Sequence, residues 1–167
     1  MRCLAIVLCV AAASCRSPES NPPPLPPPAD TWLRGLVDER FATVATQLRG
    51  FDVAMVEVGY RYGELTWAGR DRNWPYAAYQ LEKIETAIRN GVVRRPKRGA
   101  SARMIEEPLA QLRAAAEQHD PVAFDTAFAT LTTTCNACHV AEQVAFVQVA
   151  PPVDRRSPVV APTAPTR

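Results

Sequence analysis

Apolar residues recur at intervals of three or four along residues 30–67, which is the spacing of one face of an α-helix. A single helix of this length would be about 57 Å long, which is too long for a small helical domain. We therefore predict a break at Gly50, with a leading helix over 31–48 and a second helix over 50–68. The apolar stripe consists of Leu33, Val37, Phe41, Val44, Leu48, Phe51, Met55, Val58, Tyr62 and Leu65.

Further helices are indicated by polar caps that precede prolines. Asn73, with a proline two residues later, predicts a helix that ends near Gly91, and Asp120, with a proline next to it, predicts the last helix. The same apolar spacing predicts a helix over 101–118 between them. Because no stretch alternates with a period of two, we expect an all-α fold, an antiparallel four-helix bundle with an extra N-terminal helix.

The start of the chain is typical of an exported protein. A short basic region at residues 1–2 precedes an apolar run over 3–13, which is too short to span a bilayer. Small residues then precede Cys15, as in a bacterial lipoprotein signal, although Ala12 stands where leucine is usual. We predict a signal peptide over 1–14 and acylation of Cys15, which would anchor the protein to the periplasmic side of a membrane. The alternative is ordinary cleavage nearby, which leaves Cys15 as a free thiol.

Two proline-rich segments flank the central domain. Residues 15–30 include a proline run that favours extended polyproline II and predicts a stiff tether. Residues 151–167 are rich in Pro, Ala, Val and Arg without periodicity, and we expect them to be disordered. The domain therefore spans residues 31–150. The formal net charge of +2 gives no indication of a nucleic-acid partner.

The most specific pattern in the chain is Cys135-Asn136-Ala137-Cys138-His139. Cys-x-x-Cys-His is the attachment sequence of covalently bound haem. Two thiols one helical turn apart can reach the two vinyl groups of the porphyrin, and the adjacent imidazole can reach the iron from one face. The motif therefore predicts haem c attached through Cys135 and Cys138, with His139 as the proximal iron ligand.

Two other uses of a Cys-x-x-Cys pair fit this sequence less well. Zinc requires four ligands, and apart from the motif the mature chain offers only His119 and Cys15. Neighbouring Cys138 and His139 would also have difficulty binding one tetrahedral ion. A thioredoxin-type disulfide is expected in a βαβ setting, and no strand pattern precedes this motif.

A helical domain with Cys-x-x-Cys-His near its end resembles the cytochrome c′ and low-spin c-556 class of mono-haem cytochromes. The segment 128–139, Phe-Ala-Thr-Leu-Thr-Thr-Thr-Cys-Asn-Ala-Cys-His, is similar to the haem helix of that class. The segments 65–69 and 73–79 are similar to parts of small exported bacterial c-type cytochromes. The resemblance covers about residues 50–150, and only the haem motif is highly specific.

The ligand opposite His139 is open at this stage. His119 lies 20 residues earlier, which separates the two imidazoles by about 30 Å along a helix and excludes a shared iron. Met55 and Met104 both lie near the level of His139 when residues are counted from the helix turns. The resemblance favours Met55, because the c-556 type uses a methionine of the first helix, whereas cytochrome c′ has an apolar residue there. Met55 can equally be a core residue.

The resemblance implies one-electron transfer with an unknown redox partner protein, and it also allows a homodimer. The alternative is a five-coordinate haem that binds nitric oxide or carbon monoxide. An enzyme is not expected, because a haem peroxidase needs distal acid–base groups and no histidine can reach that side. Arg94, Arg95 and Arg98, in a basic loop, are candidates to pair with haem propionates, to dock an acidic partner or simply to be solvated.

Overall fold

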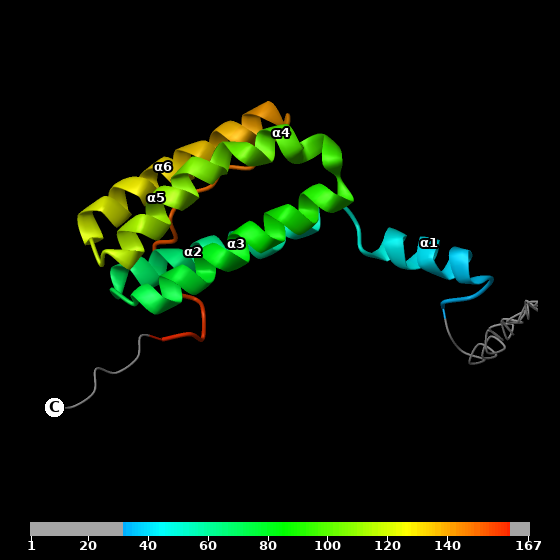
Figure 1. Cartoon of the computed structure of the whole chain (residues 1–167), viewed down its shortest axis with the longest axis horizontal. Coiled ribbons are helices and arrows are strands. Elements are labelled where there is room, and N and C mark those ends of the chain that lie inside the picture. The colour runs from blue at the N-terminus through cyan, green and yellow to red at the C-terminus, as the bar shows by residue number, and fades with distance from the viewer. Residues whose placement is uncertain (1–31, 161–167) are drawn as a thin grey trace, which may run out of the picture.

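A computed structural model of the chain describes residues 32–160, in which the regular elements are all helices and no strand occurs. The expected all-α class is confirmed. The predictions of a signal peptide, an acylated Cys15 and a tether fall outside the described residues. The elements are α1 (Val37–Gln47), α2 (Phe51–Arg70), α3 (Trp74–Arg94), η1 (Pro96–Arg98), α4 (Gly99–Ala102), η2 (Arg103–Ile105), α5 (Glu106–Glu117) and α6 (Pro121–Ala141) (Figure 1).

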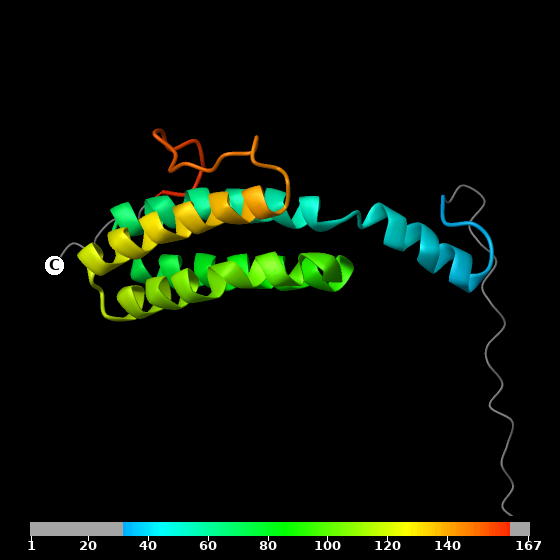
Figure 2. The same cartoon turned by 90° about the horizontal axis from the view of Figure 1, so that it is seen from above.

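The longer helices pack in two pairs. Helix α2 lies along α3, and α5 lies along α6, while α3 contacts α5 and α2 contacts α6 (Figures 1 and 2). The apolar stripes of these helices face one another and form one core. Its buried members are Tyr62, Leu65, Ala68, Ala77, Leu81, Ile84, Ile105, Leu109, Leu112, Ala115, Ala116, Phe124, Ala127, Phe128 and Leu131.

The two predicted helix starts are confirmed by their side-chain caps. The Asn73 side chain accepts a hydrogen bond from the Tyr76 amide at 3.3 Å. The Asp120 carboxylate accepts from the amides of Val122 at 2.9 Å and Ala123 at 3.1 Å. Each cap satisfies amides that have no partner within the helix, so α3 and α6 begin where the sequence indicates.

The predicted helix over 101–118 is interrupted. Helix α4 ends at Ala102, a 3₁₀ turn follows, and α5 begins at Glu106. Pro108 is the third residue of α5. A proline there has no amide hydrogen, and its ring clashes with the carbonyl of residue 104 in a continuous helix, so a regular α-helix cannot run through this position.

Gly91 does not end α3 as predicted, because the helix continues to Arg94. Gly91 is buried within α3 at the contact with α2. A Cβ atom there would lie 2.8 Å from Ala54 Cβ and 2.9 Å from a ring carbon of Phe51. Glycine at this position therefore permits a close approach of α2 and α3.

The predicted break at Gly50 is confirmed, since α1 ends at Gln47 and α2 begins at Phe51. Arg49 adopts a left-handed backbone conformation, with φ of 57°. None of the residues of α1 is buried, and the helix projects away from the two helix pairs (Figure 1).

After α6 the chain turns back over the molecule. The Val144 amide donates to the His139 carbonyl at 2.8 Å, and residues 143–150, here called the strap, return across α6 (Figure 2). Of the tail predicted to be disordered, the structure describes residues 151–160. In this part Arg155 pairs with Asp71 and lies over the Trp67 ring at 4.9 Å. Within residues 32–160 no helix is both long and apolar enough to cross a membrane.

Candidate functional site

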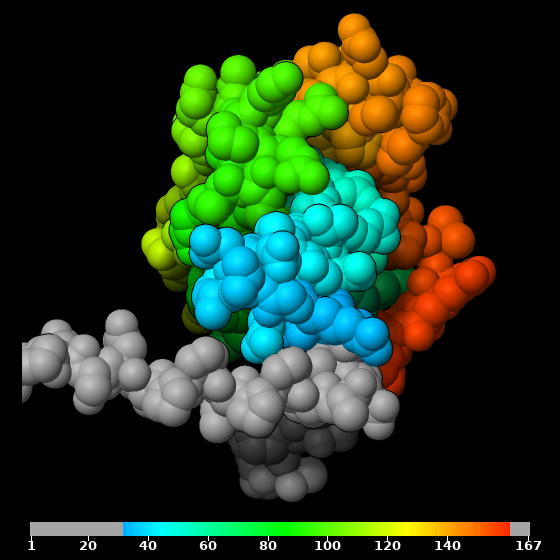
Figure 3. Space-filling model, turned by 90° about the vertical axis from the view of Figure 1, so that its right-hand side faces the viewer, coloured from blue at the N-terminus to red at the C-terminus, as the bar shows by residue number. Residues whose placement is uncertain are grey.

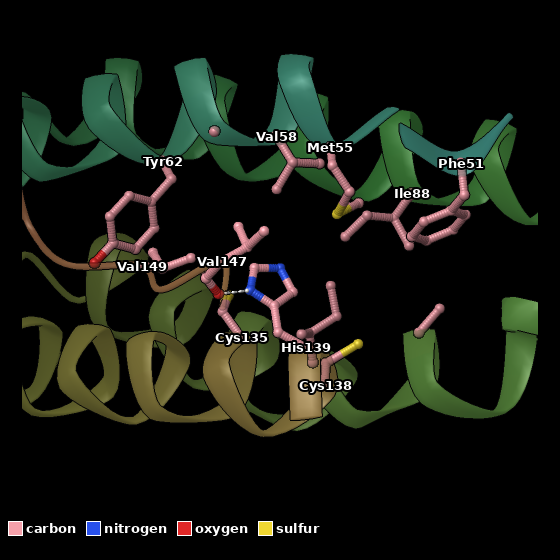
Figure 4. Close-up of a pocket in the computed structure, with 13 residues that line it drawn as sticks. Phe51, Met55, Val58, Tyr62, Ile88, Cys135, Cys138, His139, Val147 and Val149 are labelled. Atoms are coloured by element: carbon pink, nitrogen blue, oxygen red, sulfur yellow. Dashed lines mark hydrogen bonds between the residues drawn. The ribbon is translucent and has the colours of Figure 1, made fainter. Parts of the chain in front are cut away.

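An apolar cavity of about 190 Å³ lies between α2 and α6 (Figure 4). It is at the opposite end of these helices from the α2–α3 turn, and the strap covers one side. The residues that line it are Phe51, Met55, Val58, Gly59, Tyr62, Ile88, Ala102, Ile105, Cys135, Cys138, His139, Val147 and Val149.

The two cysteines and the histidine of the motif all line this cavity from α6. Cys135 and Cys138 are three residues apart in the helix, so their side chains lie on neighbouring parts of one face, and His139 follows directly. Met55 approaches from α2 on the other side of the cavity (Figure 4). Helix packing thus brings together two thiols, an imidazole and a thioether in apolar surroundings.

The orientation of His139 is set by the strap. Its Nδ1 atom lies 2.7 Å from the carbonyl oxygen of Val147 (Figure 4). A carbonyl can only accept a hydrogen bond, so Nδ1 carries the proton and donates it. In the neutral imidazole the electron pair is then on Nε2, which is the form that binds a metal ion.

The strap is held in place by Asn136, which lies between the two cysteines. The Asn136 side-chain amide donates to the carbonyl of Val149 at 3.0 Å, and its carbonyl oxygen accepts from the Val149 amide at 2.8 Å. Val149 packs against the core. This pairing fixes the chain two residues beyond Val147 and therefore supports the carbonyl that orients His139.

Both cysteines are free thiols with raised pKa values. Burial, with a smaller contribution from Cys138, raises the pKa of Cys135 to about 11. Burial also raises the pKa of Cys138, and the positive charge of Arg98 opposes this shift. The thiols are therefore protonated at neutral pH.

Tyr62 separates the cavity from the core. Its hydroxyl and that of Thr132 are 2.8 Å apart, and its ring centroid lies 4.9 Å from that of Phe128. Burial raises the pKa of Tyr62. The tyrosine thus presents an apolar ring to the cavity and keeps its hydroxyl hydrogen-bonded.

The other candidate ligands lie outside the cavity. His119 is in the turn between α5 and α6 and stacks on Trp74 with ring centroids 5.9 Å apart, at the opposite end from His139. Met104 lies in η2, is 40% exposed and does not line the cavity, whereas its neighbour Ile105 does. Of the two methionines that the sequence left open, only Met55 faces His139.

Of the three arginines predicted to lie in a basic loop, Arg94 is instead the last residue of α3, and Arg95 and Arg98 follow it. Arg98 pairs with Glu142 at the end of α6 and is close enough to Cys138 to affect its pKa. Arg95 donates a hydrogen bond to the carbonyl of Arg94 at 2.8 Å. Arg98 is therefore the loop arginine whose charge acts on a cavity residue.

Sequence reasoning did not assign a role to Asn136 or to the carbonyl of Val147. Asn136 occupies one of the variable positions of the motif, where the motif itself makes no demand. The one available signal was the short apolar run over 144–149, which is consistent with a segment that folds back onto the domain.

No protein-family model, curated protein or solved structure matches this chain. Among residues 32–160, no group of three or more His, Cys, Asp or Glu side chains is arranged to hold a metal ion.

Proposed function

We propose that the protein is an exported mono-haem c-type cytochrome that transfers single electrons. The observation that carries this proposal is that Cys135, Cys138 and His139 line one apolar cavity with Met55 on its opposite side. Two thiols at attachment spacing could bond the vinyl groups of a haem, and an imidazole with its Nε2 electron pair available and a thioether sulfur could bind its iron.

The residues of the cavity fit this group chemically. Cys135 and Cys138 would hold the porphyrin through thioether bonds, His139 would bind the iron and Met55 would be the opposite ligand. Haem, when bound, supplies an iron that cycles between the ferrous and ferric states, and a methionine ligand raises its potential. The remaining lining is almost wholly apolar, which limits access of water to the site.

The contributions of this chain are attachment, orientation and exclusion of water. The Val147 carbonyl holds the proton of His139 on Nδ1, and the resulting hydrogen bond makes Nε2 a better donor. Val147 and Val149 cover the side of the cavity nearest the strap. Arg98, near Cys138, is a candidate partner for a propionate, in competition with Glu142.

We further propose that α2, α3, α5 and α6 form an antiparallel four-helix bundle of the cytochrome c′ and c-556 type. The packing of these helices in two pairs around one core supports this assignment. The lipoprotein-type start of the sequence supports export and anchoring through Cys15 on the periplasmic side of a bacterial membrane. Electrons would be exchanged with a partner protein.

Absorption spectra of the purified holoprotein, oxidised and reduced, with and without carbon monoxide, test the proposal. We expect sharp low-spin bands that carbon monoxide does not move, together with the weak long-wavelength ferric band of a sulfur–iron bond. Met55→Ala should remove that band and allow carbon monoxide to bind. Met104→Ala should leave the spectrum unchanged, because Met104 is outside the cavity.

Two results would contradict the proposal in different ways. A high-spin spectrum of the unsubstituted protein that shifts with carbon monoxide would refute Met55 ligation and favour a five-coordinate haem that binds gases. Absence of any haem spectrum after coexpression with haem-attachment machinery would refute the cytochrome assignment itself.

A further inference from the structure

Helix α1 carries an apolar surface that the described part of the chain leaves uncovered. Leu36, immediately before the helix, is 76% exposed, and Phe41 is 69% exposed. No residue of α1 is buried. In the view from this end of the molecule, α1 stands in front of the helix pairs (Figure 3).

The exposed apolar residues lie on one face of α1. Val37 and Phe41 are four residues apart in α1, and Leu48, the residue directly after the helix, is seven residues further on with a helical backbone conformation, which places all three in one stripe. Asp38 and Ala42 lie on the other side. Helix α1 is thus amphipathic, and its apolar face does not contribute to the core.

A tryptophan and charges of both signs lie next to the stripe. Trp32, 60% exposed, precedes the helix, and tryptophan favours the boundary between headgroups and acyl chains. The charges of the helix nearly cancel, with Asp38 and Glu39 against Arg40. Attachment would therefore depend on the apolar face more than on charge.

The position of α1 in the chain favours a membrane over a second copy of the protein. Trp32 follows Cys15 by 17 residues, a length of chain that cannot span more than about 60 Å in any conformation. Any lipid on Cys15 therefore keeps α1 within reach of the bilayer.

We propose that α1 lies in the surface of a phospholipid bilayer, with Val37, Phe41 and Leu48 among the acyl chains, as a second attachment beside the lipid. The choice of a bilayer rests on the export proposed above, whereas binding by α1 needs neither haem nor the lipid. The helix pairs and the cavity would then be held close to the membrane, at the distance set by residues 49–50.

The test uses the mature chain from residue 15 onward with Cys15→Ser, so that neither a lipid nor the apolar run over 3–13 contributes to binding. Cosedimentation is measured with vesicles of phosphatidylcholine and with vesicles of equal parts phosphatidylcholine and phosphatidylglycerol. We expect binding to both, with little loss at high salt, because the contact is mainly apolar. Phe41→Asp should weaken binding at least about tenfold, since it replaces a buried aromatic ring with a charge.

Ala42→Asp is the matched control, because it adds the same charge next to Phe41 on the polar side of α1. It should bind as the unsubstituted chain does. Both variants should keep the spectrum of the parent chain, since α1 contributes no buried residue. Failure of the Cys15→Ser chain to bind either vesicle would overturn the proposal. So would a dimer in solution that Phe41→Asp dissociates and Ala42→Asp does not. A failed haem spectrum with intact vesicle binding would refute only the cytochrome function.

Discussion

Asn136 and Val149 are joined by two hydrogen bonds that run in opposite directions between one side chain and one backbone unit. The side-chain amide of Asn136 pairs with the backbone of Val149 as the backbone of a neighbouring β-strand would. Both the N–H and the C=O of Val149 therefore have a hydrogen-bond partner. Because Asn136 is part of α6 and Val149 is part of the strap, this pairing attaches the strap to the helix that carries the motif. It also supports the Val147 carbonyl, which accepts from His139.

We predict that Asn136→Ala releases the strap from α6. The free energy of unfolding should fall by about 1–2 kcal/mol, because two hydrogen bonds are lost. Native-state hydrogen exchange should accelerate at the Val149 amide, which loses its acceptor. In the holoprotein the reduction potential should also shift, since His139 would lose its fixed hydrogen bond.

Thr133→Ala is a suitable control for this experiment. Thr133 is exposed on the same helix, and its hydroxyl bonds only within α6, to the carbonyl of Ala129 at 3.1 Å. It should affect neither Val149 exchange nor the potential. If Asn136→Ala leaves both unchanged as well, Asn136 does not position the strap.

The two thiols should differ in reactivity in the protein without haem. We expect alkylation of Cys135 by iodoacetamide at pH 8 to be slow, because burial raises its pKa to about 11 and only the thiolate reacts. The rate should increase about tenfold per pH unit and level off near that pKa, as long as the fold is intact. Mass spectrometry of the alkylated peptides measures each site.

Cys138 provides the comparison in the same sample. Arg98 opposes the rise of its pKa, so Cys138 should react faster than Cys135, and Arg98→Gln should slow it. Equal rates at the two sites, both levelling off near the ordinary thiol pKa of 9.0, would show that Cys135 is not buried as described.

Two glycines of α2 should respond oppositely to alanine. A Cβ atom at Gly69 would lie 2.4 Å from the ring of Phe124, so Gly69→Ala should lower the free energy of unfolding by about 1–3 kcal/mol. A Cβ atom at Gly63 would have no neighbour within 4 Å. Gly63→Ala should raise it by up to about 1 kcal/mol, because alanine favours the helix. Thermal or denaturant unfolding measures both, and destabilisation by Gly63→Ala would contradict the open surroundings.

Much of the helical architecture was predictable because its signals are local. The caps at Asn73 and Asp120 and the break at Gly50 depend on residues within one turn of the helix end. Apolar spacing then identified the inner faces of α2, α3, α5 and α6, whereas the apolar face of α1 lies outside the core. The break before α5 was missed although Pro108 signals it, because the apolar pattern continues across the interruption.

The candidate site was predictable only in its chemistry. The motif and helix arithmetic placed His139 level with Met55, and both line the cavity. The choice between Met55 and Met104 could not be made from the sequence, because it depends on the direction in which the Met104 side chain leaves η2. The hydrogen bonds of His139 and Asn136 join residues 8 and 13 positions apart, respectively, across a turn. The periodicity of apolar residues gives no information on such contacts.

The strap has a consequence for the order of assembly. The described hydrogen-bond partners of the Asn136 side chain and of His139 Nδ1 all lie after the motif, at residues 147 and 149. A chain that crosses a membrane with its N-terminus first therefore exposes Cys135 and Cys138 before the residues that cover them arrive. Haem attachment would then take place while both thiols are accessible. Closure of the strap would be the final folding step at this site.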